Sequence, residues 1–261
     1  MAIIIAVIVV TVIGIICAIV LAVASKVMHV PVDERVTQLT EALPGANCGG
    51  CGFPGCSGYA AALVEDPDLS LTLCAAGGNA CAQAMAAILG KEAGEMVAQV
   101  AVVHCKGDCQ YTENKTDYQG ISSCAAAKLM YGGPGSCIYG CLGLGDCANV
   151  CINDAICIEN GIAHVDTRLC TGCGACVKAC PNSVISVKPA ANPVWVTCSN
   201  KEKGPLAMKH CKVSCIGCKL CEKNCPNEAI KVNNNCAVID YDKCDGCGKC
   251  AEACKRNCFS I

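Results

Sequence analysis

The chain has 261 residues, a formal net charge of −2 and 30 cysteines. The small net charge excludes the strong positive field with which proteins attract nucleic acids, and two Phe, one Trp and six Tyr are too few for a large aromatic core. Thiols repeated at two-residue intervals are poorly placed to join distant segments as disulfides. Metal or iron–sulfur ligation in a reducing compartment is therefore the favoured interpretation.

The N-terminal segment is apolar from Ala2 to Ala24, with no charge and with Thr11 as its only polar residue. As a helix, such a segment spans roughly 34 Å, enough to cross the hydrocarbon core of a bilayer. A signal peptide is the alternative, but no Lys or Arg precedes the run, which is also longer than a signal needs. We expect a transmembrane anchor over residues 1–26. Lys26 and Arg35 follow the run, so the positive-inside rule places the rest of the chain in the cytoplasm.

Residues 27–100 are predicted to form a small helical domain. Apolar positions at helical spacing predict a helix over 32–43, which ends at Pro44. A second helix is expected over 57–64, and the segment 82–103 is expected to pass from helix into a short strand. The spacing C-x2-C-x4-C-x17-C around a glycine-rich loop suits a [4Fe–4S] site, with the ligands Cys48, Cys51, Cys56 and Cys74.

Residues 101–136 are interpreted as a connector that contains three cysteines, Cys105, Cys109 and Cys124. With a fourth thiol from elsewhere, such as Cys198, Cys211 or Cys81, they would hold a further cluster. The alternative is that they are free thiols or thiols packed in the core.

An internal repeat begins after the connector, because CPNSVISV at 180–187 and CPNEAIKV at 225–232 follow one plan. Residues 137–190 are predicted to form a first module and residues 215–261 a second, joined by a linker over 191–214. Short β-branched runs between the cysteine loops predict small hairpins.

The second module contains C-x2-C-x2-C-x3-C twice, a pattern that resembles bacterial two-cluster ferredoxins. In that family the fourth cysteine of each run ligates the other cluster. The resemblance implies one cluster on Cys215, Cys218, Cys221 and Cys254, and another on Cys225, Cys244, Cys247 and Cys250.

The same exchange is predicted for the first module, which contains CTGCGACVKACP at 170–181. It gives one set of Cys151, Cys170, Cys173 and Cys176, and another of Cys137, Cys141, Cys147 and Cys180. The upstream run departs from the pattern by its x3, x5, x3 spacing and by Ile152 in place of proline. Zinc is the alternative, but four-thiolate zinc sites usually have two separated cysteine pairs, not unbroken triplets.

The apolar N-terminal helix, the loop GANCGGCGFPGCSGYA and the two modules together resemble the B subunit of the Rnf complex, an ion-translocating ferredoxin:NAD⁺ oxidoreductase. The resemblance covers essentially the whole chain, and SCIYGCLGLGDC points to the longer, anaerobe-type form. It implies an α+β multi-domain protein with five [4Fe–4S] clusters, or six if the connector holds one. It also implies electron transfer from soluble ferredoxin into a membrane complex of other Rnf subunits, which reduces NAD⁺ and moves Na⁺ or H⁺.

No dinucleotide or triphosphate motif occurs in the chain, so the NAD⁺ and flavin chemistry implied by the family belongs to partner subunits. No catalytic residue is predicted. Two alternatives stay open: the same relay serving a redox-sensing regulator, and a zinc-binding membrane adaptor without redox chemistry. A basic rim is the candidate docking surface for an acidic ferredoxin, unless it is merely a solvated face; its residues are Lys201, Lys203, Lys209, Lys212, Lys255 and Arg256.

Overall fold

The computed structural model describes residues 2–27 and 33–261, with side chains described for 11–24 and 33–261. Its first element is the helix α1, Ala2–Val27. Among the residues with described side chains, no helix is both long and apolar enough to cross a membrane. The expected anchor over residues 1–26 lies partly outside the residues whose side chains the structure describes.

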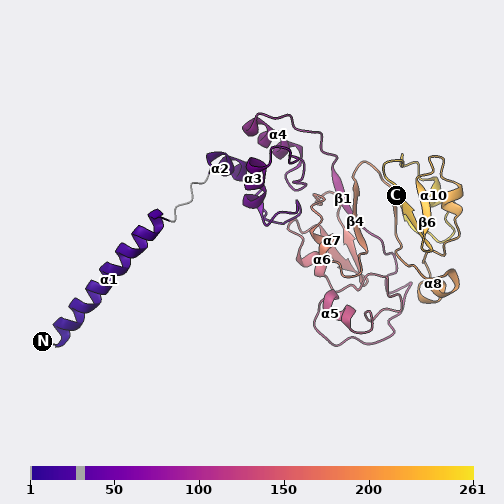
Figure 1. Ribbon diagram of the computed structural model, residues 1–261. Coiled ribbons are helices and arrows are strands. Elements are labelled where there is room, and N and C mark those ends of the chain that lie inside the picture. Colours follow the sequence, from indigo (N-terminus) through magenta and orange to yellow (C-terminus); the bar gives the residue numbers. More distant parts are fainter. Residues whose placement is uncertain (1, 28–32) are drawn as a thin grey trace.

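Three helices form the domain that carries the first cysteine loop (Figure 1). They are α2 (Glu34–Ala42), α3 (Cys56–Glu65) and α4 (Gly78–Leu89). The Asp33 carboxylate caps α2 by accepting a hydrogen bond from the Arg35 backbone N–H at 2.9 Å. Leu39, Tyr59 and Met85 are fully buried, one from each helix, and form the centre of the domain's core.

The first module consists of short helices and strands, among them the hairpin that its sequence predicts. Its elements are α6 (Asp146–Asn149), β2 (Ile156–Glu159), β3 (Ile162–Val165), α7 (Ala175–Ala179) and β4 (Ile185–Pro189). β2 and β3 form an antiparallel hairpin. β4 pairs with β1 (Gln99–Val103), which comes from the segment before the module. The predicted domain boundary at residue 100 therefore falls inside a strand that completes the first module.

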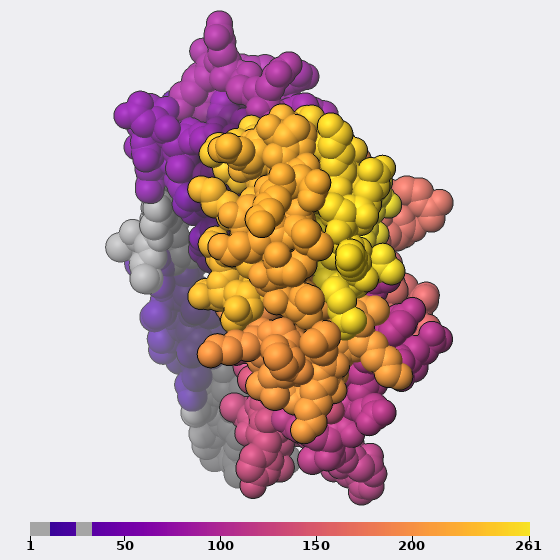
Figure 2. All heavy atoms as spheres, turned by 90° about the vertical axis from the view of Figure 1, so that its right-hand side faces the viewer, coloured from indigo at the N-terminus to yellow at the C-terminus, as the bar shows by residue number. Residues whose placement is uncertain are grey.

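The second module repeats this plan. Its elements are α9 (Leu220–Lys223), β6 (Ile230–Asn233), β7 (Cys236–Ile239), α10 (Lys249–Ala253) and β8 (Phe259–Ser260). β6 and β7 form the hairpin, and β8 pairs with β5 (Trp195–Val196) from the predicted linker. Figure 2 shows this module on the near face of the molecule.

The repeat thus includes a strand upstream of each module. Val103 of β1 pairs with Ile185, and Val196 of β5 pairs with Phe259. Since Ile185 and Phe259 both lie five residues after the last cysteine of their module's cluster loops, β1 and β5 are equivalent strands. His104 joins the two units, because its ring nitrogens lie 2.6 Å from the Val196 carbonyl oxygen and 2.7 Å from the Ser186 hydroxyl.

The connector and the linker lie side by side, although about a hundred residues separate them in the chain. The connector carries α5 (Cys124–Leu129) and the linker carries α8 (Gly204–His210). The Thr112 hydroxyl donates to the His210 carbonyl oxygen at 2.8 Å, and the Lys212 N–H donates to the Tyr111 carbonyl oxygen at 2.9 Å. This contact brings cysteines of both segments together.

Candidate metal centres

Every cysteine is a free thiol in the structure. Within the described part of the chain, no group of three or more His, Cys, Asp or Glu side chains is arranged to hold a single metal ion. The thiols gather in sets, and four of these sets each line a cavity.

The first set lies in the helical domain and consists of the four thiols that the spacing predicts, Cys48, Cys51, Cys56 and Cys74. The Asn47 side-chain oxygen accepts a hydrogen bond from the Cys56 N–H at 2.8 Å, which fixes the cysteine loop to the start of α3. Burial raises the pKa of Cys74, and the charges of the other three thiols raise it further. Four thiolates this close need positive charge between them, which a metal cluster supplies.

The set of Cys151, Cys170, Cys173 and Cys176 is also brought together as predicted. Burial raises the pKa of Cys176 to about 11, and the charges of the other three thiols raise it further. Two backbone N–H groups point at the Cys170 sulfur, from Ala101 at 3.3 Å and from Gly172 at 3.5 Å. Such donors stabilise a thiolate that ligates a cluster and set its reduction potential.

In the second module the structure gathers seven of the eight thiols as the ferredoxin resemblance implies. Burial raises the pKa of Cys221 to about 12, and the charges of its three set members, Cys215, Cys254 and Cys218, raise it further. Burial likewise raises the pKa of Cys250 to about 11, with further contributions from Cys244 and Cys225. Cys247, the fourth member of that set, is exposed.

The remaining set of the first module differs from the predicted one. The structure places Cys124 beside Cys141, Cys147 and Cys180, and these four line one cavity. Burial raises the pKa of Cys147 to about 12, and the charges of the other three thiols raise it further. Cys137, which the spacing assigns to this set, lies instead near thiols of the linker.

The backbone explains why Cys137 does not belong to this loop. The two modules have three other cluster loops, which begin at Cys170, Cys215 and Cys244. In each, a glycine with positive φ lies two positions after the first cysteine; these are Gly172, Gly217 and Gly246. Gly143, with φ 69°, is the equivalent glycine, so Cys141 opens the loop. Leu144 then occupies the position of the second thiol, and this loop needs a ligand from elsewhere.

Asp146 brings that ligand to the loop. Its carboxylate accepts hydrogen bonds from the Ser123 hydroxyl at 3.0 Å and from the Ala125 N–H at 2.9 Å. These groups flank Cys124 at the start of α5. The helix α5 is thereby held against α6. Its first residue, Cys124, supplies the thiol that the loop lacks at Leu144.

A sixth set lies where the connector meets the linker, around a cavity of about 510 Å³. Six cysteines line it; Cys141 belongs to the first module and Cys109 is exposed, which leaves Cys105, Cys137, Cys198 and Cys211 as the members of the set. Burial raises the pKa of Cys137 to about 11, and the charges of Cys198 and Cys211 raise it further. Gly107 leaves room between two of the sulfurs, because a Cβ there would lie 3.0 Å from Cys211 Sγ and 3.9 Å from Cys105 Sγ.

Of the three connector cysteines that were predicted to act together, the structure separates Cys124 from the other two, since Cys105 and Cys109 both line the cavity of the sixth set. Cys105 belongs to the sixth set and Cys124 to the first module. Cys109 is exposed, and its N–H donates to the Asn160 carbonyl oxygen at 3.0 Å. Cys81, one of the suggested partners, lies in the helical domain, where its thiol donates to the Ala42 carbonyl oxygen at 3.3 Å.

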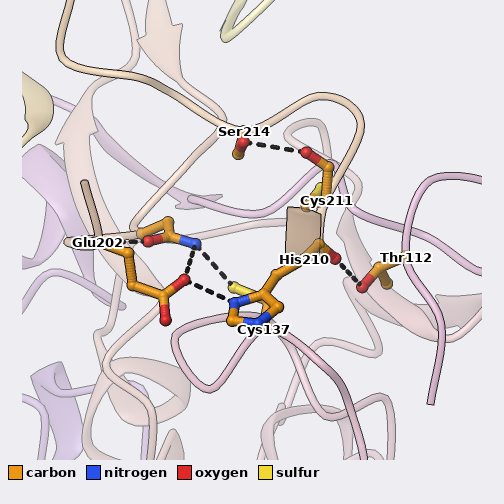
Figure 3. Close-up of polar contacts among 7 residues, drawn as sticks. Thr112, Cys137, Glu202, His210, Cys211 and Ser214 are labelled. Carbon is orange, nitrogen blue, oxygen red and sulfur yellow. Dashed lines mark hydrogen bonds and ion pairs between the residues drawn. The ribbon is translucent and has the colours of Figure 1, made fainter. Parts of the chain in front are cut away.

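Polar side chains hold the sixth set in place (Figure 3). The Asn200 amide donates to Cys137 Sγ at 3.3 Å and also contacts Glu202. The Glu202 carboxylate lies 2.8 Å from Nδ1 of His210, the residue before Cys211. One network thus fixes two of the four thiols.

Two thiols outside the sets contact the second module's first set. Cys236 and Cys258 are buried in one cluster with Cys215, and their S–H groups donate to the carbonyl oxygens of Cys198 at 3.1 Å and of Val213 at 3.4 Å. Equivalent positions of the first module carry aliphatic side chains, Ile162 and Val184. The two modules thus surround similar sites with different side chains.

Paired modules whose cysteine runs exchange their fourth thiols define a ferredoxin-type iron–sulfur protein, a class that transfers electrons. Family models agree with this class. The model described as "Putative Fe-S cluster" matches residues 43–75, and the 4Fe-4S binding domain matches residues 163–186, 214–231 and 237–260. The loop that opens at Cys141 lies outside these matches.

Relatives narrow the class to one family. The chain is 47% identical to the B subunit of the Na(+)-translocating ferredoxin:NAD(+) oxidoreductase complex of Acetobacterium woodii, over 95% of this chain and 74% of the relative. It is 43% identical to the B subunit of the proton-translocating complex of Clostridium ljungdahlii, over 93% and 86%. Identity to the B subunit of the ion-translocating oxidoreductase complex of Methanosarcina acetivorans is 37%, over 95% and 94%. The chain belongs to this family, the B subunits of Rnf complexes, and its role is electron transfer.

Proposed function

We propose that the chain carries electrons from reduced ferredoxin into a membrane-bound Rnf complex that reduces NAD⁺ and moves Na⁺ or H⁺. The observation that carries the proposal is a continuous series of thiol sets whose neighbouring members contact one another. Electron relay needs such contacts and needs neither a catalytic acid or base nor a nucleotide site on this chain. The named relatives differ in their coupling ion, so sequence similarity does not select one ion here.

Each thiol set is proposed to hold one [4Fe–4S] cluster, which when bound takes up and releases one electron at a time. The sets fit such a cluster because each supplies four sulfurs, and a bound cluster would offset the charge of their thiolates. The six proposed sets are Cys48, Cys51, Cys56 and Cys74; Cys124, Cys141, Cys147 and Cys180; Cys151, Cys170, Cys173 and Cys176; Cys105, Cys137, Cys198 and Cys211; Cys215, Cys218, Cys221 and Cys254; and Cys225, Cys244, Cys247 and Cys250.

Direct contacts join neighbouring sets. The Cys215 N–H donates to Cys198 Sγ at 3.3 Å, which links the second module to the set between connector and linker. Cys105 of that central set and Cys141 of the first module line the same cavity. Within the first module, the Cys180 N–H donates to the Cys176 carbonyl oxygen at 3.1 Å, so ligands of its two sets share a helix end. These contacts support a relay from the second module toward the first.

Ferredoxin is proposed to dock beside Cys218, the exposed thiol of its set. Gly204, at the start of α8, lies against the Ile216 backbone, so α8, which carries Lys209 and follows Lys203, adjoins this cluster loop. Arg256 is engaged elsewhere, since its guanidinium donates to the carbonyl oxygens of Ser214, Cys211 and Lys212. The docking surface is therefore assigned to the lysines Lys201, Lys203, Lys209, Lys212 and Lys255, whose charge would steer an acidic partner.

The apolar N-terminal segment is proposed to anchor the protein in the cytoplasmic membrane, with the cysteine domains on the cytoplasmic side. Its length and its lack of charge support the anchor, and the following Lys26 and Arg35 support the orientation. The other Rnf subunits are proposed to accept the electrons at the membrane.

Iron and sulfide content with EPR of the dithionite-reduced, anaerobically purified chain tests the proposal. Six clusters correspond to roughly 24 iron atoms per chain, and five to roughly 20. A colourless protein that binds zinc in place of iron would refute the relay and favour the structural adaptor. For the docking surface, reversing the five lysines to Glu is expected to slow ferredoxin-dependent reduction at low salt, with a smaller difference from wild type at high salt.

A further inference from the structure

The cysteine loop of the helical domain packs directly on a cluster loop of the first module. A Cβ on Gly50 would overlap the Cys173 carbonyl oxygen, and it would lie 3.5 Å from Cys48 Sγ. The Lys178 ammonium donates to the Gly49 carbonyl oxygen at 2.7 Å. Cys173 also lines the cavity of the helical domain's own thiol set. Ligand loops of two different sets therefore touch across a domain boundary.

The conformation of Gly50 shows that the contact, and not the backbone, requires a glycine. Four of the five other glycines in the segment 45–58 have a positive φ, which favours glycine by itself. Gly50 is not among the residues with positive φ, so an alanine could adopt its conformation. Only the approach of the Cys173 backbone excludes a side chain at this position.

Lys178 holds the same contact from the other domain. It lies in the last turn of α7, the helix that begins one residue before Cys176. Its hydrogen bond to the Gly49 carbonyl oxygen joins α7 to the cysteine loop. A positive charge between two thiolate sets also reduces their mutual repulsion.

We propose that Gly50 and Lys178 are positioning residues that hold the helical domain's cluster site against the site of Cys173, and that this contact is the route by which electrons pass between the first module and the helical domain. The inference rests on the proposed relay function and adds its last step within the chain. One electron leaves the site of Cys173 and one electron is gained by the site of Cys48, with no proton or atom transferred. Since tunnelling rates fall steeply with distance, a side chain at Gly50 would slow this step without changing any ligand.

The test uses the full-length, iron-loaded chain and the variant Gly50→Val. Gly94→Val is the matched control, because Gly94 is exposed, also lacks a positive φ, and would bring its Cβ only to an ordinary 3.7 Å from Thr72. The readouts are iron content, midpoint potentials, the magnetic coupling between the two reduced clusters in EPR, and the rate at which the helical domain's cluster is reduced after rapid mixing. Gly50→Val is expected to keep the iron content and potentials while losing coupling and slowing reduction several-fold.

Lys178 provides a second, independent variant that leaves the cysteine loop intact. Lys178→Glu is expected to weaken the coupling, and Lys178→Arg to preserve it. Unchanged coupling and reduction rate in both Gly50→Val and Lys178→Glu, with iron content intact, would overturn the inference. If Gly50→Val loses iron, the comparison of Lys178→Glu with Lys178→Arg tests the inference by itself. Failure of the relay function itself is distinguishable, because it would appear as missing clusters in the wild-type protein.

Discussion

Two double variants distinguish the structural assignment of the first module from the one that spacing predicts. Cys147 serves the same site in both assignments, whereas Cys124 and Cys137 exchange places. In the structure Cys124 and Cys147 line one cavity, so replacing both with Ala disables one site and removes roughly four of 24 iron atoms. Replacing Cys137 and Cys147 with Ala disables two sites and removes roughly eight. The spacing-based assignment reverses these two results if Cys124 ligates a connector cluster, and otherwise gives an equal loss for both pairs.

Iron and acid-labile sulfide, measured against the single Cys147→Ala variant, provide the assay. Within one site a second substitution adds little to the first, whereas substitutions in separate sites add fully. Cys157→Ala is the control, because Cys157 is an exposed thiol on β2 that belongs to no set. The reasoning is refuted if the pair of Cys124 and Cys147 loses as much iron as the pair of Cys137 and Cys147, or more.

Three further variants test the surroundings of the sites. Cys258→Val and Cys236→Ile give the second module the side chains that the first module has, and replacing two polar thiols beside Cys215 with apolar groups is expected to lower the midpoint potential of the cluster on Cys215. EPR-monitored redox titration measures this shift, and equal potentials in variant and wild type would contradict it. Asp146→Ala removes two hydrogen bonds to α5, which destabilises this contact by about 1–3 kcal/mol. The variant should bind one cluster fewer, measured as iron content. Full iron content would show that the Asp146 hydrogen bonds are not needed to hold Cys124 at its site.

Local patterns made much of the fold predictable. The hairpin of each module follows from short β-branched runs between cysteine loops, and the helices around Leu39 and Tyr59 follow from apolar spacing. Thiol sets with three cysteines in one loop and a fourth from the module's other loop were also predictable, because the residues of the loop itself determine its geometry. The structure brings these thiols together at the expected places.

Ligands that come from distant segments were not predictable in the same way. Cys124 reaches its site through Asp146, a contact between two segments whose spacing resembles no ferredoxin pattern. One clue was nevertheless present in the sequence. CLGLGDC at 141–147 aligns with CTGCGAC at 170–176 glycine by glycine, with Leu144 in place of a cysteine. Glycine positions therefore indicated the register more reliably than the number of thiols did.

The central thiol set depends on a different kind of signal, the duplication of a strand. Cys105 and Cys198 each follow equivalent strands by two residues, after Val103 and Val196. Neither strand lies inside its cysteine module, so the repeat of the cysteine runs did not include them. Once the strand pairs are aligned, the two thiols are equivalent residues that face one cavity.

His104 should control this central set without being a ligand. Its ring joins the end of β1 to Val196 of β5 and to Ser186 of β4, so it fixes Cys105 and Cys198 relative to each other. His104→Phe keeps the ring's bulk but leaves the two partners unpaired, at a cost of about 1–3 kcal/mol each. The variant is expected to lose the central cluster, roughly four iron atoms, although all four thiols remain.

The pH dependence provides the decisive comparison. Burial lowers the pKa of His104, so the folded protein favours the neutral ring. An unfolded histidine titrates near pH 6.5, and below that pH the unfolded chain binds the extra proton. The stability that His104 contributes is therefore fully present above about pH 6.5 and declines as the pH falls toward the lowered pKa. Iron release by the wild-type protein should accelerate over this range, relative to that of His104→Phe. Parallel profiles for the two proteins would show that His104 does not link the strands that hold the central thiols.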